Sequence, residues 1–165
     1  MRYLTLIRHA KSSWKDPDLR DFDRPLNKRG RHNAPLMGRV MKKNGLTAER
    51  ILSSPAERAI TTARLIAAEL GYPERQIEQL DELYAAGSEQ LLRCVQALEK
   101  GVTRVALVGH NPGLTQFCND LSGAGIDNLP TCAVAVIEFD LDEWSAVHPG
   151  LGRLARMEYP RLYTG

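Results

Sequence analysis

Short apolar segments alternate with amphipathic ones along this chain. Residues 3–7 and 104–109 are rich in Leu, Ile and Val, which is typical of parallel strands that are covered on both faces. Residues 49–54 form a third segment of this kind. Two later apolar runs, 132–140 and 152–160, indicate strands that we expect to pair antiparallel at an edge. The pattern therefore predicts a mainly parallel sheet.

The segment that follows residues 49–54 carries the clearest helix signals. Ser54 and Glu57 have the spacing of a capping box, and Pro55 stands at the first helical position. Apolar side chains then recur at helical spacing until Gly71, which is a typical helix stop. We expect a helix to begin beside Pro55 and to end at Gly71.

Three further helices are predicted between the strands. Residues 26–45 have helical character, and we expect Pro35 to kink this helix or to divide it. Residues 88–99 repeat the helical pattern, and Asn111 with Pro112 is typical of a cap that starts another helix. Alternating strands and helices predict an α/β fold.

The length and charge of the chain limit the possible classes of protein. At 165 residues and 43% apolar composition, the chain has the size of one domain, so residues 1–165 are expected to form a single-domain three-layer sandwich with helices on both faces of the sheet. The 22 basic and 20 acidic residues give a net charge of +2 without any block of like charge. Neither a nucleic acid nor a membrane is predicted as a partner.

The first apolar segment and the cysteines bear on the cellular compartment. Residues 3–7 are too short for a signal peptide or a membrane span, so we expect a cytoplasmic protein. Cys94, Cys118 and Cys132 lack CxxC spacing, so that neither a disulfide framework nor a zinc site is indicated. We interpret them as reduced thiols.

Four polar residues follow predicted strands at the same edge of the sheet. Arg8 and His9 come directly after the first strand, and His110 comes directly after residues 104–109. Arg58 lies in the first turn of the helix after the third strand. Because ligands bind beyond the carboxyl ends of parallel strands, we expect these side chains to converge.

The chemistry of these four residues favours a phosphate site. A cation in the first helical turn opposes the helix dipole, and a bound anion would resolve that conflict for Arg58. Guanidinium groups offer forked donors that match phosphoryl oxygens, and His9 is then a candidate nucleophile. Each residue alone is more often structural or solvated, and only their shared placement favours function. His32 and His148 lack this placement and are interpreted as structural.

Three motifs carry a family resemblance. "LIRHAKSSW", "SSPAERAITTA" and "LVGHNPGL" resemble the ordered motifs of the histidine phosphatase superfamily. With "RPLNKRG" they most closely resemble its short branch, the SixA-type phosphohistidine phosphatases. The resemblance spans nearly the whole chain.

The resemblance implies covalent catalysis. His9 would attack phosphorus and become phosphohistidine, while Arg8, Arg58 and His110 would bind the phosphoryl oxygens before water releases phosphate. This scheme requires no metal and no cofactor. The "DFD" segment at residues 21–23 offers a metal-assisted alternative, but no apolar strand precedes it, and we interpret its acids as solvated.

The sequence departs from the wider family at two places. Trp14 is followed by Lys15, where related mutases and sugar phosphatases carry asparagine. Glu82 is the candidate for the general acid of the wider family, and Asp81 is the second choice. Both residues fit equally well as acids of a surface loop. An alkoxide leaving group needs such an acid, whereas an imidazole, whose reference pKa is about 6.5, leaves phosphorus readily.

These expectations favour a metal-independent phosphatase that acts on phosphohistidine in a protein. A phosphatase or mutase for small phosphate esters on the same fold is the alternative enzyme, and a phosphate-binding module without catalysis is the alternative from another class. Residues 11–24 form a long segment beside the expected pocket, where Arg24 would contact a protein substrate or face solvent.

Overall fold

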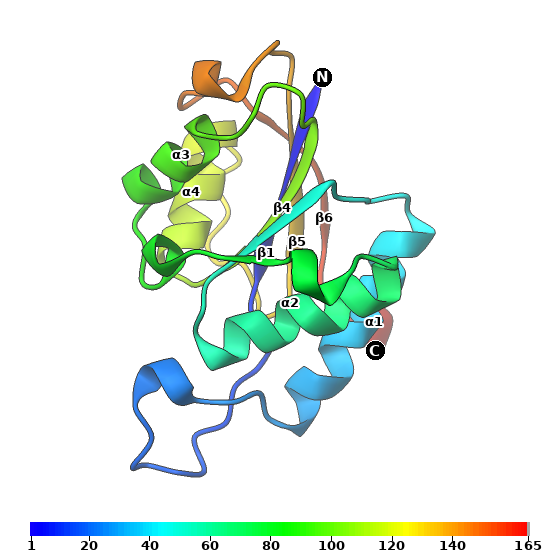
Figure 1. The fold of residues 1–165 in the computed structure, drawn as a ribbon, viewed down its shortest axis with the longest axis vertical. Coiled ribbons are helices and arrows are strands. Elements are labelled where there is room, and N and C mark those ends of the chain that lie inside the picture. The colour runs from blue at the N-terminus through cyan, green and yellow to red at the C-terminus, as the bar shows by residue number, and fades with distance from the viewer. Residues whose placement is uncertain (165) are drawn as a thin grey trace.

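One sheet separates two pairs of helices in the computed structural model, which describes residues 1–164 (Figure 1). The strands are β1 (Arg2–Arg8), β2 (Arg50–Ser53), β3 (Glu78–Gln79), β4 (Arg104–Gly109), β5 (Val134–Phe139) and β6 (Arg153–Glu158). The helices are α1 (Lys28–Lys43), α2 (Glu57–Leu70), α3 (Ser88–Gln96), α4 (Gly113–Ser122) and α5 (Arg161–Thr164). Four short 3-10 helices complete the elements: η1 (Asp21–Asp23), η2 (Glu74–Gln76), η3 (Asp81–Leu83) and η4 (Trp144–Ala146).

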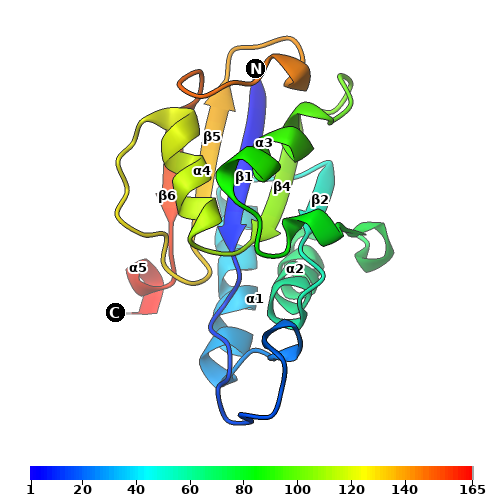
Figure 2. The ribbon, with the colours of Figure 1, turned by 90° about the vertical axis from the view of Figure 1, so that its left-hand side faces the viewer.

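The strand order is β3-β2-β4-β1-β5-β6. Figure 2 shows β2, β4, β1, β5 and β6 side by side in this order. β1, β4, β2 and β3 are mutually parallel, while β5 pairs antiparallel with β1, and β6 antiparallel with β5. The mainly parallel sheet and its antiparallel edge are thus confirmed. Strand β3 was not predicted, because two polar residues give no apolar pattern.

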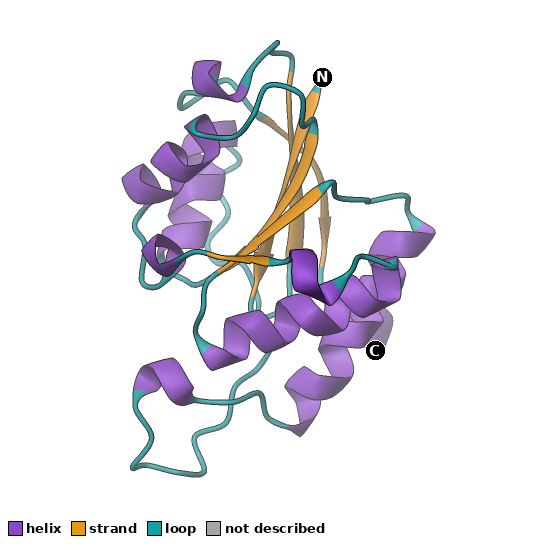
Figure 3. Ribbon diagram, in the orientation of Figure 1, coloured by secondary structure: helices purple, strands orange, loops and turns teal. Residues whose placement is uncertain are grey.

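Helices α1 and α2 cover one face of the sheet, and α3 and α4 cover the other (Figure 3). Successive side chains of β4 alternate between these layers. Val105 and Leu107 pack in the core beneath α3 and α4, whereas Ala106 and Val108 pack beneath α1 and α2. This burial on both faces explains the unbroken apolar runs and confirms the three-layer sandwich. No helix within residues 1–164 is both long and apolar enough to cross a bilayer.

Helix α1 runs through Pro35 without being divided, so of the two expected effects, a kink or a division, the division is wrong. Proline removes one backbone donor from the helical hydrogen bonds. The helix nevertheless buries Ala34, Met37 and Met41, and burial of a Met side chain typically stabilises by about 1.5–3 kcal/mol. The side chain of Asn27 caps the N-terminus by accepting a hydrogen bond from the Gly30 N–H at 2.8 Å.

Two glycines allow helix N-termini to approach the loops beside the sheet edge. A methyl group on Gly30 would collide with the carbonyl oxygen of Lys11, which follows β1. A methyl group on Gly113 would collide with the carbonyl oxygen of Ala86, in the segment before α3. The absence of a Cβ therefore allows α1 and α4 to pack directly against backbone on two sides of the sheet edge.

Candidate active site

The carboxyl ends of β1, β4 and β2 bring three polar residues side by side. The N–H of His9 donates to the carbonyl of Gly109 at 3.1 Å, and the N–H of Ser54 donates to the carbonyl of Val108 at 3.0 Å. His9, His110 and Ser54 therefore leave three adjacent strands at one edge. The rings of His9 and His110 have centroids 5.2 Å apart.

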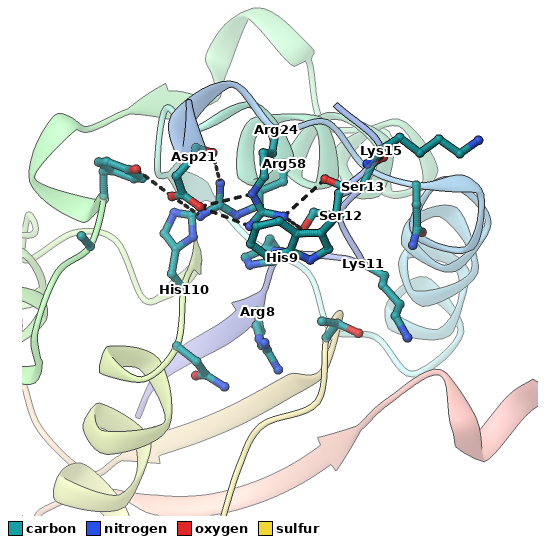
Figure 4. Close-up of a pocket in the computed structure, with 16 residues that line it drawn as sticks. Arg8, His9, Lys11, Ser12, Ser13, Lys15, Asp21, Arg24, Arg58 and His110 are labelled. Atoms are coloured by element: carbon teal, nitrogen blue, oxygen red, sulfur yellow. Dashed lines mark hydrogen bonds and ion pairs between the residues drawn. The ribbon is translucent and has the colours of Figure 1, made fainter. Parts of the chain in front are cut away.

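A pocket of about 680 Å³ opens over this edge (Figure 4). All four residues expected to converge line it, namely Arg8, His9, Arg58 and His110. The other lining residues are Lys11, Ser12, Ser13, Trp14, Lys15, Asp21, Arg24, Asn27, Tyr84, Ala85, Asn111 and Thr131. Five cationic side chains and one carboxylate thus surround one cavity, which is suited to an anion.

His9 is held in the state that a nucleophile needs. Its side chain is buried, with 7% of the residue exposed, and Nδ1–H donates to the carbonyl of Ala10 at 2.7 Å. Burial, together with the charges of Arg58 and Arg8, lowers the pKa of His9 to about 4. At neutral pH the imidazole is uncharged, and the lone pair lies on Nε2.

The hydroxyl of Thr62 connects the segment after β1 to helix α2. The Ala10 N–H donates to Oγ1 of Thr62 at 3.0 Å, and that hydroxyl donates to the Arg58 carbonyl at 2.7 Å. The first turns of α2 therefore hold the backbone next to His9 close to the backbone of Arg58.

Arg58 forms a two-point contact with Asp21 on η1. Its Nη1 donates to the carbonyl of Asp21 at 2.6 Å, and its Nη2 donates to Oδ2 at 2.9 Å. Asp21 is thus tied to α2, although 53% of its side chain is exposed, so the expectation that the acids of residues 21–23 are solvated holds only in part for Asp21. Tyr84 donates a further hydrogen bond to Oδ2 at 2.8 Å.

Arg24 fixes the outer wall of the pocket. Its Nη1 donates to Ser12 Oγ at 2.7 Å, its Nε donates to Asp21 Oδ1 at 3.3 Å, and its guanidinium stacks 3.6 Å from the ring centroid of Trp14. Arg24 is buried, so a solvated position is excluded, whereas 76% of Trp14 is exposed. Lys15 also lines the pocket, at the position where related enzymes carry asparagine.

Ser54 holds His110 rather than capping α2. Its Oγ lies 2.7 Å from His110 Nε2 and accepts the N–H of Ala56, which is the N-cap residue of α2. The predicted capping box with Glu57 is therefore wrong. A hydrogen bond donated by the Ser54 hydroxyl to Nε2 would leave the proton of His110 on Nδ1. Burial, with the charges of His9 and Arg58, lowers the pKa of His110 to about 3.

Replacing Ser54 with alanine is expected to lower kcat about tenfold to hundredfold, because His110 would lose the partner that sets its tautomer and orientation. Ser53→Ala is the matched control, since Ser53 Oγ donates only to a neighbouring carbonyl among the described contacts. Steady-state kinetics with thermal unfolding distinguish the two variants. Equal kcat losses in both would show that Ser54 supports only the fold.

Three buried nitrogen atoms of this pocket have no hydrogen-bond acceptor within the described residues. Within residues 1–164, Nε of Arg8, Nε of Arg58 and Nδ1 of His110 have no hydrogen-bond partner. Buried donors are normally satisfied, and the oxygens of a phosphoryl group would satisfy donors of this kind. Across the same residues, no group of three or more His, Cys, Asp or Glu side chains is placed to hold a metal ion.

Glu82 is not brought to the pocket. It is exposed on η3 and does not belong to the lining residues, whereas the adjacent Leu83 is buried in the core and Tyr84 lines the cavity. Asp81 is exposed as well. The hypothesis that Glu82 is the general acid therefore has no geometric support.

Comparison with known proteins connects this geometry to a family. A sequence profile of the histidine phosphatase superfamily (branch 1) matches residues 4–92. The chain belongs to this superfamily. An uncharacterised chloroplastic protein of Arabidopsis thaliana is 32% identical over 87% of this chain and 69% of its own length.

Solved structures of SixA proteins have a fold similar to that of this histidine phosphatase. A crystal structure from Agrobacterium tumefaciens, assigned as a phosphohistidine phosphatase SixA, matches with a TM-score of 0.81 and 29% identity over 96% of this chain and 98% of that one. The protein histidine phosphatase SixA in complex with tungstate matches with a TM-score of 0.83 over 97% and 98% of the two chains. At 24% identity this second likeness concerns the fold alone. The predicted SixA-type resemblance is confirmed.

The contacts of several residues in the site of this histidine phosphatase were not predicted from the sequence. Ser54 was assigned to a helix cap, Asp21 to solvent, and Thr62 and Tyr84 had no assigned role. A faint signal was present for Asp21, because it lies near Arg24 in a segment between two motifs. Nothing in the sequence indicated the contact of Ser54 with His110, which depends on the pairing of β2 with β4.

Proposed function

We propose that this protein is a metal-independent phosphatase that removes the phosphoryl group from phosphohistidine in a partner protein. The observation that carries the proposal is a buried, neutral His9 whose Nδ1–H is held by the Ala10 carbonyl, in a pocket with five cations and one carboxylate. A neutral imidazole beside concentrated positive charge suits attack on a phosphoryl group. The assignment of the 29% identical relative as a phosphohistidine phosphatase supports the same conclusion.

The first step transfers the phosphoryl group to His9. Nε2 attacks phosphorus, the N–P bond of the substrate breaks, and its electron pair returns to the substrate nitrogen. A substrate ring that carries a proton on its other nitrogen leaves as neutral imidazole. The His9 proton stays on Nδ1, against the Ala10 carbonyl, so the positive charge passes to the His9 ring. Arg8, Arg58 and His110 would stabilise the charge on the equatorial oxygens.

The second step returns the enzyme to its starting state. Water attacks phosphorus, the bond between phosphorus and Nε2 breaks, and its electron pair returns to His9. Both protons of the water remain with the product, which leaves as dihydrogen phosphate. Neither step needs a proton from an acid on the protein.

This proton balance favours a nitrogen leaving group over an alkoxide. Hydrogen bonds from Tyr84 and Arg58 outweigh the effect of partial burial and lower the pKa of Asp21 to about 2, so the one lining carboxylate is ionised at neutral pH. Glu82 lies outside the lining. An alkyl ester phosphatase or mutase would need a proton donor at the pocket. A pure binding module has no need for a neutral nucleophile.

Rapid-quench labelling with a phosphohistidine-containing protein tests this function. We expect an acid-labile phosphoryl group on the enzyme within the first turnover, and a kcat/KM at least tenfold higher for phosphohistidine than for an alkyl phosphate such as glycerol phosphate. A preference for the alkyl ester would favour the small-molecule phosphatase. Binding of phosphate without any labelling would favour the binding module.

A further inference from the structure

The carboxylate of Asp21 accepts several hydrogen bonds at the edge of the pocket. It lies on the long segment between β1 and α1, which reaches back over the start of α2 (Figure 4). Oδ2 accepts hydrogen bonds from Arg58 and Tyr84, and Oδ1 accepts one from Arg24. Three donors from three separate parts of the chain thus fix the position of one carboxylate.

The carboxylate still has capacity for another donor. Two carboxylate oxygens offer about four lone-pair sites. The hydrogen bonds from Arg24, Arg58 and Tyr84 use three of them, and Arg24 Nη2 also lies 3.2 Å from Oδ1. Asp21 lines the pocket, and 53% of its side chain is exposed. Arg58, by contrast, has 7% of its side chain exposed. The pocket therefore offers a substrate an accessible carboxylate in addition to its cations.

We propose that Asp21 accepts a hydrogen bond from the protonated ring nitrogen of the leaving imidazole and thereby selects N-phosphoryl substrates over phosphate esters. This inference rests on the proposed function and adds to it the residue that recognises the leaving group. A cationic imidazole ring brings an N–H donor, whereas the oxygen of an ester leaving group brings none. The contact holds the ring in the protonation state that leaves as a neutral molecule.

The charge of Asp21 suits this role and excludes proton donation. A carboxylate that is ionised at neutral pH accepts hydrogen bonds and has no proton to give an alkoxide. The five cationic side chains of the pocket attract an anionic group, whereas Asp21 attracts a cationic group at one point of the same pocket. The substrate has this same division of charge, with an anionic phosphoryl group joined to a cationic ring.

The test compares two small substrates that differ in the leaving group, phosphoimidazole and p-nitrophenyl phosphate. We expect Asp21→Asn to lower kcat/KM for phosphoimidazole at least tenfold more than for p-nitrophenyl phosphate, within the range that charged hydrogen bonds supply. Asp23→Asn is the matched control. Asp23 lies on the same 3-10 helix and pairs with Arg20 at 2.8 Å, outside the lining residues, so its substitution should change neither rate.

The outcomes separate this inference from the proposed function. Equal losses of kcat/KM for both substrates in Asp21→Asn would show that Asp21 only orients Arg58. No loss for either substrate would show that Asp21 is dispensable. Each of these two outcomes overturns this inference but leaves the proposed function standing. Failure of the unmodified enzyme to hydrolyse phosphoimidazole and phosphohistidine, with turnover of p-nitrophenyl phosphate, would overturn both. Circular dichroism of each variant establishes that the comparison is made between folded proteins.

Discussion

His9→Ala is expected to reduce phosphate release by roughly 10⁴-fold or more, because the variant lacks the group that attacks phosphorus. The fold should persist, since His9 supports the core through its backbone bond to Gly109, which alanine retains. Phosphate release and circular dichroism are measured on the same sample. Rapid-quench experiments should detect no phosphoryl group on the variant.

His32→Ala serves as the control for this result. His32 is an exposed residue of α1 and does not line the pocket, so its loss should leave turnover and labelling unchanged. Substantial turnover by a folded His9→Ala protein would mean that water or another side chain attacks phosphorus directly. The covalent scheme would then have to be abandoned.

Arg58→Ala is expected to lower kcat/KM by about a hundredfold or more, which corresponds to about 2.7 kcal/mol of lost transition-state binding. Arg58 Nε is one of the three buried nitrogen atoms of the pocket that have no partner in the described chain, and its charge lies beside both histidines. The free energy of unfolding should change by less, because its partner Asp21 is half exposed and removal of the cation relieves the N-terminus of α2. Kinetics and denaturant unfolding together measure the difference.

Two further variants sharpen the assignment of Arg58. Arg58→Lys keeps the charge but loses the forked donors, so it should recover only part of the lost kcat/KM. Arg64→Ala removes a half-exposed arginine from the same helix and should leave kinetics unchanged. Unfolding of Arg58→Ala with normal kinetics in the remaining folded fraction would identify Arg58 as a structural residue.

The sequence predicted the elements that are decided by local pattern. β1 and β4 are buried on both faces, so they appear as unbroken apolar runs, and Gly71 ends α2 in the left-handed conformation that glycine favours. The convergence of Arg8, His9, Arg58 and His110 was also predictable. These residues lie at or after the ends of β1, β4 and β2, and the carboxyl ends of parallel strands meet at one edge.

The remaining features depend on contacts that are distant in sequence. Ser54 is a reasonable helix cap when only its neighbours are considered, but strand pairing places it beside His110, 56 residues later. Asp21 has the same ambiguity, because its partner Arg58 is 37 residues away. Local chemistry offers each of these side chains two plausible partners, and only the tertiary fold chooses between them.

Gly30 and Gly113 bear on how this pocket can change during evolution. At both positions a helix packs directly against loop backbone, so the spacing between these helices and loops is set by main chain rather than by side chains. Exchanging the side chains that line the pocket can alter its charge and shape but leaves this spacing unchanged. New substrate preferences are therefore expected to arise through side-chain changes in the segment that carries Trp14 and Asp21.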